Sequence, residues 1–359
     1  MSEFRIDQIT NQSGSRGPDI AGITTFTGTS GMVMPSGPTE YRGGRGRGIF
    51  AGGYNSGLIN AIDYITIATT GNASDFGDLI SANRGCSAAS NSTRGVICNA
   101  LNSNRIEYIT ISSTGNTFDF GDLLKETFYP GCAADNTRAL FAGGYDQPNT
   151  FYRTIEYITI STLGNSSEFG LLQTVEGSGD KNKSGRTNLA ACSSPTRAIF
   201  AGGNGGFNYP STAPSTNIID YVTIQSLGNG QDFGDLTLDR MGVGGCSSSV
   251  RGVFGGGHTG TTISPLNVTN ILDYITIASL GNVQDFGDLT QARERVHSCS
   301  NSIRGVWGGG RSESSPDTPL NTIDYITITS TGNAADFGDL TQTRYESGSC
   351  SDAHGGLGD

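Results

Sequence analysis

The chain has 359 residues, of which 54 are glycine and only 15% are charged; its formal net charge is −11 and its pI is near 4.7. An acidic surface repels a phosphate backbone, so we expect no nucleic-acid partner. No apolar run reaches the ~20 residues of a membrane-spanning helix, and no basic-then-apolar signal segment opens the chain. The glycine content favours short strands joined by tight turns over a helical or disordered chain.

The first 45 residues alternate apolar and polar side chains and contain no copy of the repeat that follows. The apolar positions are Phe4, Ile6, Ile9, Ile23 and Phe26. A segment of this length cannot build its own core, but it can add strands to a partner's sheet through main-chain hydrogen bonds. We therefore expect residues 1–45 to be an extended docking arm, with Arg42–Arg47 as a hinge; the alternative is that the arm folds back over the rest of the chain.

Residues 46–359 contain six copies of one block, which at its clearest reads Ile-Asp-Tyr-Ile-Thr-Ile, a Gly-Asn turn, then Asp-Phe-Gly-Asp-Leu. Its tyrosines are Tyr64, Tyr108, Tyr157, Tyr221, Tyr274 and Tyr325. A repeat of roughly 40 to 50 residues made of short strands is typical of a β-propeller with one blade per repeat. The sequence therefore predicts a single propeller of six blades over residues 46–359.

The fifth repeat shows the strands of one blade. β-rich runs lie around Cys246 and over 251–257, 271–277 and 285–289, and Gly, Asn and Ser turns separate them. This pattern predicts an all-β fold of four-stranded antiparallel blades. The first blade lacks its first strand, which reappears at 344–351. We expect the C-terminal strand to complete the first blade and close the ring, because closure removes two exposed sheet edges.

Cysteines and charged residues also recur once per repeat. The cysteines are Cys86, Cys132, Cys192, Cys246, Cys299 and Cys350. We expect them at equivalent positions on a ring, as buried thiols too far apart for disulfides.

An arginine begins each expected second strand, and an acid precedes each tyrosine. The arginines are Arg47, Arg94, Arg138, Arg197, Arg251 and Arg304, and the acids are Asp63, Glu107, Glu156, Asp220, Asp273 and Asp324. We expect the two series to pair within or between blades; a six-fold anion site is the alternative.

The repeats differ most in their second-to-third-strand loops and in the long connection 173–188. These segments should open on one face, and long variable loops are where function concentrates. Their aromatic residues lie among Asn, Ser, Thr and Gly: Tyr54, Tyr145, Phe151, Tyr152, Phe207 and Tyr209. Flat rings beside amides and hydroxyls suit a carbohydrate surface, although the same rings could simply pin the loops. We take these residues as candidate binding residues.

Signatures of catalysis and of metal binding are missing from the sequence. The three histidines, His258, His297 and His354, lie in different repeats without metal-ligand spacing. No nucleophile elbow, zinc-protease motif or isolated carboxylate pair stands out. We expect a protein that is not an enzyme and uses no cofactor or metal.

The repeat resembles the kelch and galactose-oxidase type of propeller, in which a strand ending in Gly-Gly is followed by a variable loop and an acid-Tyr strand. The Gly pairs here include Gly52-Gly53, Gly143-Gly144 and Gly202-Gly203. The second repeat departs at Ile97–Ala100, and phenylalanine replaces the outer-strand tryptophan of kelch repeats. The copper-ligand set of galactose oxidase has no counterpart here.

The arm, the Gly-Asn-x-x-Asp-Phe-Gly-Asp-Leu block and the ending Ser351–Gly358 together resemble structural proteins of tailed phages of marine bacteria, notably cyanophages. The resemblance implies a tail- or fibre-associated virion protein, made in the host cytoplasm and fixed to other virion proteins by residues 1–45. The propeller would then meet a host-surface glycan or receptor, or a neighbouring subunit. The alternative function is a cellular kelch-like module that binds protein or carbohydrate.

Overall fold

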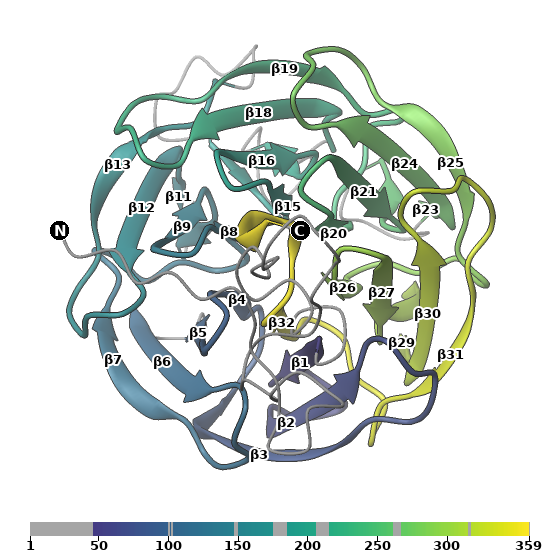
Figure 1. The fold of residues 1–359 in the computed structure, drawn as a ribbon, viewed down its shortest axis with the longest axis horizontal. Helices are drawn as coiled ribbons and strands as arrows, with labels where there is room; N and C mark the ends of the chain where they lie inside the picture. Colours follow the sequence, from purple (N-terminus) through teal and green to yellow (C-terminus); the bar gives the residue numbers. More distant parts are fainter. Residues whose placement is uncertain are drawn as a thin grey trace, which may run out of the picture. The chain divides into compact units, whose positions relative to one another are not determined.

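The computed structural model describes residues 46–99, 101, 103–146, 150–174, 185–205, 215–260, 267–314 and 317–358. Within them, six four-stranded antiparallel sheets are arranged as the blades of a propeller (Figure 1). The predicted fold class is confirmed. The predicted arm, with Phe4, Ile6, Ile9, Ile23 and Phe26, lies outside the described residues and stays a prediction. No helix among the described residues has the length and apolar character needed to cross a membrane.

Each blade runs from an inner strand at the central channel to an outer strand at the rim. Blade 1 contains β32 (Gly348–Ser351), β1 (Arg47–Ala51), β2 (Ile59–Thr66) and β3 (Ser74–Asn83). Blade 2 contains β4 (Ser87–Ser90), β5 (Arg94–Cys98), β6 (Arg105–Thr110) and β7 (Phe118–Asp122). Blade 3 contains β8 (Gly131–Ala134), β9 (Arg138–Ala142), β12 (Thr154–Thr159) and β13 (Ser167–Leu171).

The other three blades follow the same order. Blade 4 contains β15 (Ala190–Ser193), β16 (Arg197–Ala201), β18 (Ile218–Thr223) and β19 (Gln231–Asp235). Blade 5 contains β20 (Gly244–Ser247), β21 (Arg251–Gly255), β24 (Ile271–Thr276) and β25 (Gln284–Asp288). Blade 6 contains β26 (His297–Ser300), β27 (Arg304–Gly308), β30 (Thr322–Thr327) and β31 (Ala335–Asp339).

Short two-stranded ribbons extend some of the loops, and a single turn of 3-10 helix follows the last strand. The ribbons are β10 (Tyr145–Asp146) with β11 (Thr150–Phe151), β14 (Arg186–Thr187) with β17 (Asn204–Gly205), β22 (His258–Thr259) with β23 (Asn267–Val268), and β28 (Arg311–Ser314) with β29 (Asp317–Pro319). The helical turn is η3 (Gly355–Leu357).

The C-terminal strand closes the ring as predicted. β32 pairs antiparallel with β1, with Gly48 opposite Ser351 and Ala51 opposite Gly348. The two ends of the repeat region are thereby joined by main-chain hydrogen bonds across about 300 residues of sequence. The inner strand of blade 1 is thus supplied by the C-terminal end of the chain, and its pairing covers the inner edge of β1.

The Gly-Asn turn that marks each repeat is a junction between blades. At the junction of blades 1 and 2, Gly115 N donates to Phe76 O (2.8 Å) and Asn116 Oδ1 accepts from Asp78 N (3.0 Å). Gly77, at φ +148°, has no room for a Cβ because the Gly115 carbonyl lies against it. The asparagine bond recurs at the other five junctions. The Gly-Asn motif, the most conspicuous of the sequence, therefore joins neighbouring blades of the fold.

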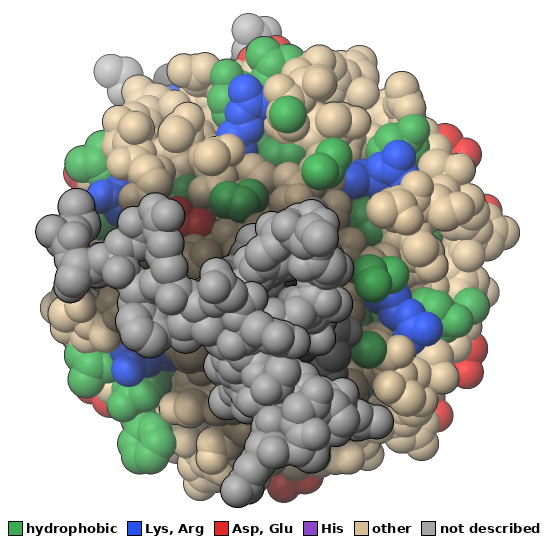
Figure 2. Space-filling model, in the orientation of Figure 1, with side chains coloured by type: hydrophobic (Ala, Val, Ile, Leu, Met, Phe, Trp, Pro, Cys, Tyr) green, Lys and Arg blue, Asp and Glu red, His purple; other side chains and the backbone are tan. Residues whose placement is uncertain are grey.

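The six arginines that begin the second strands do not pair with the repeated acids, which corrects the sequence-based expectation. Each guanidinium lies 4.3–4.9 Å from the ring centre of its own blade's tyrosine. Each also donates to a main-chain carbonyl of the next blade, as Arg47 Nη1 does to Ile111 O (2.8 Å). Figure 2 shows Lys and Arg side chains at intervals around one face, beside hydrophobic side chains. These arginines therefore join blades through stacking and carbonyl contacts.

A different set of arginines binds the repeated acids in four blades. The pairs are Arg344 with Asp63, Arg186 with Asp220, Arg240 with Asp273, and Arg293 with Asp324, and all eight side chains are fully buried. In blade 5, Arg240 Nη2 lies 2.5 Å from the Asp273 carboxylate and Nη1 donates to Gly256 O and Ile271 O (both 2.9 Å). These hydrogen bonds offset the large cost of burying both charges.

Blades 2 and 3 lack this arginine and carry glutamate in place of aspartate. Asn83 and Thr127 stand at the arginine position. In blade 2, Asn99 replaces the repeated glycine and its Nδ2 donates to Glu107 Oε1 (2.5 Å). This contact explains why the second repeat departs from Gly-Gly. In blade 3, Glu156 accepts from Ser166 Oγ and Leu124 N instead, and burial raises the pKa of its carboxyl group.

The cysteine series is also corrected by the structure. All seven cysteines are free thiols. Only Cys192, Cys246, Cys299 and Cys350 occupy the same third position of an inner strand; Cys132 lies one residue earlier in its strand, and Cys86 precedes its strand. Blades 2 and 3 have Ala89 and Ala133 at that position.

The size of each of these inner-strand side chains matches a residue of the next blade. A Cβ added to the facing glycine of the next blade's second strand would lie 2.5–3.1 Å from the sulfur; the pairs are Cys192 with Gly252, Cys246 with Gly305, Cys299 with Gly48, and Cys350 with Gly95. Ala89 and Ala133 instead pack in the same clusters as Ala139 and Ala198. Where the inner strand has cysteine, the facing residue of the next blade is therefore glycine, and where it has alanine, the facing residue is alanine.

Replacing Arg240 with leucine should destabilise the protein by about 3–5 kcal/mol, because Asp273 would be left buried without its cation. Urea unfolding followed by circular dichroism measures the change. The double variant Arg240→Leu with Asp273→Leu should recover most of the loss. A single variant that unfolds within about 1 kcal/mol of the parent chain would contradict this role of the pair.

The size match between blades predicts a coupled pair of substitutions. Ala89→Cys should destabilise the protein by about 1–3 kcal/mol, because Ala139 leaves no room for the added sulfur. Adding Ala139→Gly should restore part of that stability, as in the cysteine-bearing blades. A double-mutant cycle by denaturant unfolding gives the coupling energy, and strictly additive effects would rule out the proposed packing.

Candidate functional site

The described parts of the variable segments lie on one face of the propeller, as predicted; we call this the loop face. Second-to-third-strand loops form bridges with the connections that lead into inner strands. The bridged pairs are Tyr54 with Tyr345, Phe128 with Tyr145, Met241 with His258, and Glu294 with Arg311. In these four blades, the described part of the loop is therefore held by the connection that leads into an inner strand.

Six residues of the connections form a closed ring of main-chain hydrogen bonds around the channel on the loop face. They occupy equivalent positions, all with positive φ: Gly85, Tyr129, Asn188, Gly242, Arg295 and Glu346. Each N–H donates to the carbonyl of the preceding member, over 2.7–3.4 Å. We call this ring the mouth. Four of its members are not glycine, and such backbone conformations typically cost about 1 kcal/mol or more each.

The side chains of the mouth break the six-fold pattern. Tyr129 belongs to the connection into blade 3 and Arg295 to that into blade 6, on opposite sides of the ring. Arg295 reaches across, and its Cζ lies 5.4 Å from the centre of the Tyr129 ring. Its guanidinium also forms an ion pair with the buried carboxylate of Glu346, which Arg84 approaches to 3.7 Å.

A second buried carboxylate lies beside the first. Glu294 forms ion pairs with Arg311 (2.6 Å) and Arg295 (3.8 Å) and a close contact with His258 Nδ1. Burial alone would raise the pKa of Glu294, but the hydrogen bond to His258 and the charges of Arg295 and Arg311 hold it at about 2. Glu294 is therefore ionised at neutral pH, and it fixes two arginines at the mouth.

The predicted aromatic residues lie around this mouth in two groups. Tyr54 packs edge-on against Tyr345 (5.6 Å between ring centres), and the Arg84 guanidinium lies 4.8 Å above it. Tyr145 stacks on Phe128, Tyr129 and Phe151, at 5.2–6.1 Å.

Tyr152 lies at the outer edge of the second group. Its hydroxyl contacts Asp146 (3.3 Å), and Lys125 lies 4.6 Å above its ring. Burial and the neighbouring Asp146 carboxylate raise the pKa of Tyr152 to about 12. The other two predicted aromatic residues, Phe207 and Tyr209, lie outside the described residues.

A pocket beneath the mouth reaches His297. The space there is lined by Tyr129, Asn188, Arg295, His297 and Glu346 together with apolar groups such as Leu189 and Val243. Burial, and secondarily the charge of Arg295, lowers the pKa of His297 to about 4. The imidazole is therefore neutral at pH 7, and one ring nitrogen can donate a hydrogen bond to a hydroxyl group while the other can accept one.

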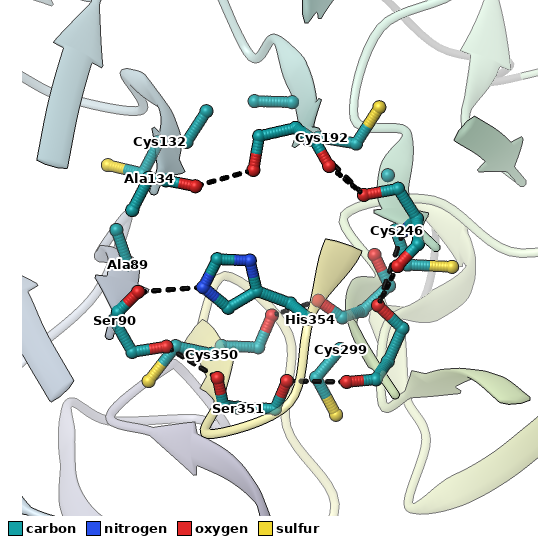
Figure 3. Close-up of a pocket in the computed structure, with 18 of the residues that line it drawn as sticks. Ala89, Ser90, Cys132, Ala134, Cys192, Cys246, Cys299, Cys350, Ser351 and His354 are labelled. Atoms are coloured by element: carbon teal, nitrogen blue, oxygen red, sulfur yellow. Dashed lines mark hydrogen bonds between the residues drawn. The ribbon is translucent and has the colours of Figure 1, made fainter. Parts of the chain in front are cut away.

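The opposite end of the channel is a ring of hydroxyl-to-carbonyl hydrogen bonds closed by one histidine (Figure 3). Five serines donate to the inner strand of the preceding blade over 2.6–2.8 Å: Ser90, Ser193, Ser247, Ser300 and Ser351. Blade 3 has Ala134 at this position and cannot donate. His354 Nε2 supplies the missing bond to Ser90 O (2.7 Å), because its Nδ1 already accepts from Gly356 N. The C-terminal segment thus completes the ring.

Sequence reasoning missed the mouth itself, including Tyr129, Arg295, Glu346, Arg84 and Tyr345. A signal was available, because aligned connections place Gly, Tyr, Asn, Gly, Arg and Glu at one position. Glycine and asparagine at equivalent sites indicate a left-handed backbone, which makes the tyrosine and the two charged residues there unusual. No group of three or more potential metal ligands occurs among the described residues.

No protein-family model matches the chain, and a search of curated proteins finds no similar sequence. The architecture and the site geometry therefore carry the functional argument. The six four-stranded blades are compatible with a kelch-type repeat protein.

The lowered pKa of the half-buried His297 predicts a pH-dependent stability. Its pKa is about 6.5 when exposed and about 4 in the folded chain, so the unfolded state binds one more proton between these values. Stability should fall as pH drops from 6.5 to 4 and gain nothing from this group above 6.5. Melting temperatures measured across pH 4–8 should show a flatter profile for His297→Asn. Parallel profiles in the two chains would show that His297 does not carry this dependence.

Proposed function

We propose that this protein is a non-catalytic structural component of a phage virion, fixed to the particle by residues 1–45, whose loop face contacts a glycan on the host surface. The observation that carries the proposal is that the repeated residues and the non-repeated residues of the ring have different roles. The repeated polar groups described above form hydrogen bonds, ion pairs or ring contacts within or between blades. The six equivalent positions of the mouth, in contrast, carry five different residue types, and the loops beside it also differ between blades.

The chemistry of the loop face suits recognition of a polar ring-shaped ligand. Tyr54, Tyr129 and Tyr152 are half-buried rings, each with a cationic side chain over one face. Asn188 and His297 line the pocket beside Tyr129 and offer hydrogen-bonding groups. Aromatic rings stack on the C–H faces of sugars, and preformed polar groups fix their orientation. Ordered Arg–Tyr stacks lose little side-chain entropy when a ligand binds. The same preformed surface serves binding better than a reaction that needs a mobile acid or base.

Attachment through the N-terminal segment is supported by its sequence alone. Alternating apolar residues in 1–45 suit strand addition to another virion protein, and this part of the sequence, with the repeat, resembles phage structural proteins. A chain without residues 1–45 should fail to enter particles that incorporate the full chain. Equal incorporation of both chains would favour the cellular interaction module instead.

Binding to intact candidate host cells tests the loop face. The labelled full chain should bind, and added surface polysaccharide should compete. Tyr152→Ala should weaken binding about tenfold, which is the size of effect expected when one aromatic contact is lost from an interface. Leu227→Ala is the matched control, because Leu227 is an exposed apolar side chain in a third-to-fourth-strand turn on the other face. Equal effects of the two substitutions, or binding that no polysaccharide competes, would contradict a glycan-binding loop face.

A further inference from the structure

We propose that Cys98 and Cys132 are a redox-active pair, which a peroxide converts into a disulfide that joins blades 2 and 3. The structure holds both residues as thiols. The disulfide adds a covalent bond to a junction held by hydrogen bonds and packing, and it stabilises that junction. It also anchors the strand that follows Tyr129 of the mouth, because Cys132 lies three residues after that tyrosine.

The two cysteines occupy positions at which no other blade has a cysteine. Cys98 ends its second strand, where the other five blades have alanine or glycine. Cys132 is the second residue of its inner strand, where the other five blades have alanine, glycine or serine. The regular cysteines, such as Cys246, lie at the third position of that strand. Cys98 and Cys132 therefore both depart from the pattern, and they do so in neighbouring blades.

The backbone directs these two side chains toward each other's blade. At Gly308, which ends the second strand of blade 6, an added Cβ would lie 2.8 Å from an aromatic ring of the next blade. At Gly245, the second residue of the inner strand of blade 5, it would lie 2.8 Å from a main-chain oxygen of the preceding blade. By the same geometry, Cys98 points toward blade 3 and Cys132 points toward blade 2.

The contacts of the two thiols agree with this arrangement. Cys98 is buried in the cluster that contains Phe141 of blade 3, and its Sγ lies 3.3 Å from Ser87 O. Cys132 packs against the same cluster and forms a side-chain hydrogen bond with Cys98. The Ser87 hydroxyl donates to Pro130 O (2.5 Å), which holds the approach to the inner strand of blade 3 beside blade 2. A disulfide requires two sulfur atoms on facing backbones, and this junction provides them.

An oxidant reaches the pair through the channel. Cys132 is the one partly exposed residue among the seven cysteines, all of which the structure describes, whereas Cys98 is fully buried. Cys132 lines two spaces of the channel, of about 50 and 70 Å³; the first is drawn in Figure 3. One water molecule needs roughly 10–15 Å³ of such space, so a peroxide molecule fits next to Cys132.

The reaction balances with hydrogen peroxide as the oxidant. The Cys132 sulfur attacks one oxygen, the O–O bond breaks, and the leaving hydroxide takes up the thiol proton to give water. The Cys98 sulfur then attacks the sulfenic sulfur of Cys132. The S–S bond forms, the S–O bond breaks, and the leaving hydroxide takes the Cys98 proton to give a second water. The two thiols lose two electrons and two protons, and the peroxide is reduced to two waters.

Oxidation of the full-length chain, followed by mass spectrometry, tests the pair. After treatment with hydrogen peroxide, a tryptic digest made without reductant should contain residues 95–105 joined to residues 126–138, and dithiothreitol should separate them. Cys98→Ala and Cys132→Ala should each abolish the link. Both variants should fold, because other blades have alanine at these positions. Cys246→Ser is the matched control, and it should form the link as the parent chain does.

Two further measurements separate a native pair from incidental oxidation. Burial raises the pKa of the Cys132 thiol well above its usual value, and the hydrogen bond to Cys98 raises it further. Since the thiolate is the reactive form, the rate of linking should rise about tenfold per pH unit between pH 7 and 9. The linked chain should melt about 5 °C higher than the reduced chain, because the disulfide restricts the unfolded state.

Four outcomes would overturn the proposal. The first is a pair that stays reduced at pH 9 in the folded chain while the urea-unfolded chain is oxidised. The second is oxidation of Cys132 to a sulfinic acid without any link. The third is a disulfide from either residue to Cys86, or loss of the link in Cys246→Ser. The fourth is a linked chain that melts no higher than the reduced chain, which would show that the disulfide does not stabilise the junction.

Discussion

The structure depends on closure of the ring. Each blade is held to its neighbours by the Gly-Asn junction at the rim, the arginine-to-carbonyl bond, and the match of inner-strand side chains with the next blade. None of these contacts forms within an isolated repeat. The pairing of β32 with β1 supplies the last junction, and the main-chain ring at the mouth and the hydroxyl ring at the far end need all six blades in place. Closure therefore positions the candidate site as well as the core.

The fold could be predicted from the sequence because its strongest signals are local and periodic. Turn glycines, the acid-Tyr strands and the repeat length together identify a four-stranded blade. Partners across blades were harder to predict. Arg47 and its equivalents recur in all six repeats, and regular recurrence suggested pairing with the equally regular acids. The arginines that do pair, such as Arg240, are absent from two blades, so they did not stand out as a series.

Strand register and the residues with positive φ at the mouth were the other features that the sequence did not predict. Counting one cysteine per repeat does not say whether each falls at the same point of its strand, and a shift of one residue, as at Cys132, turns a side chain to the other face. The predicted aromatic residues that are described do lie on the loop face, where the mouth is. Tyr129, Arg295 and Glu346 lie together because the ring brings connections from three blades to one opening. Their equivalent positions can be found by aligning the repeats, but the contacts between their side chains cannot.

Blades 2 and 3 both depart from the repeated pattern of the scaffold, and in blade 3 the departures lie beside the aromatic cluster at the mouth. The inner strand of blade 3 ends at Ala134, which cannot donate to its neighbour, and His354 from the C-terminal segment takes over. Its connection carries Thr127 where four blades have an arginine, so Glu156 is left with hydroxyl and main-chain partners. The same connection supplies Phe128 and Tyr129 to the aromatic cluster at the mouth. Departures from a repeat that stabilises the fold are expected where a sequence serves binding rather than stability. Blade 3 therefore combines departures from the scaffold pattern with the larger of the two described aromatic groups on the loop face.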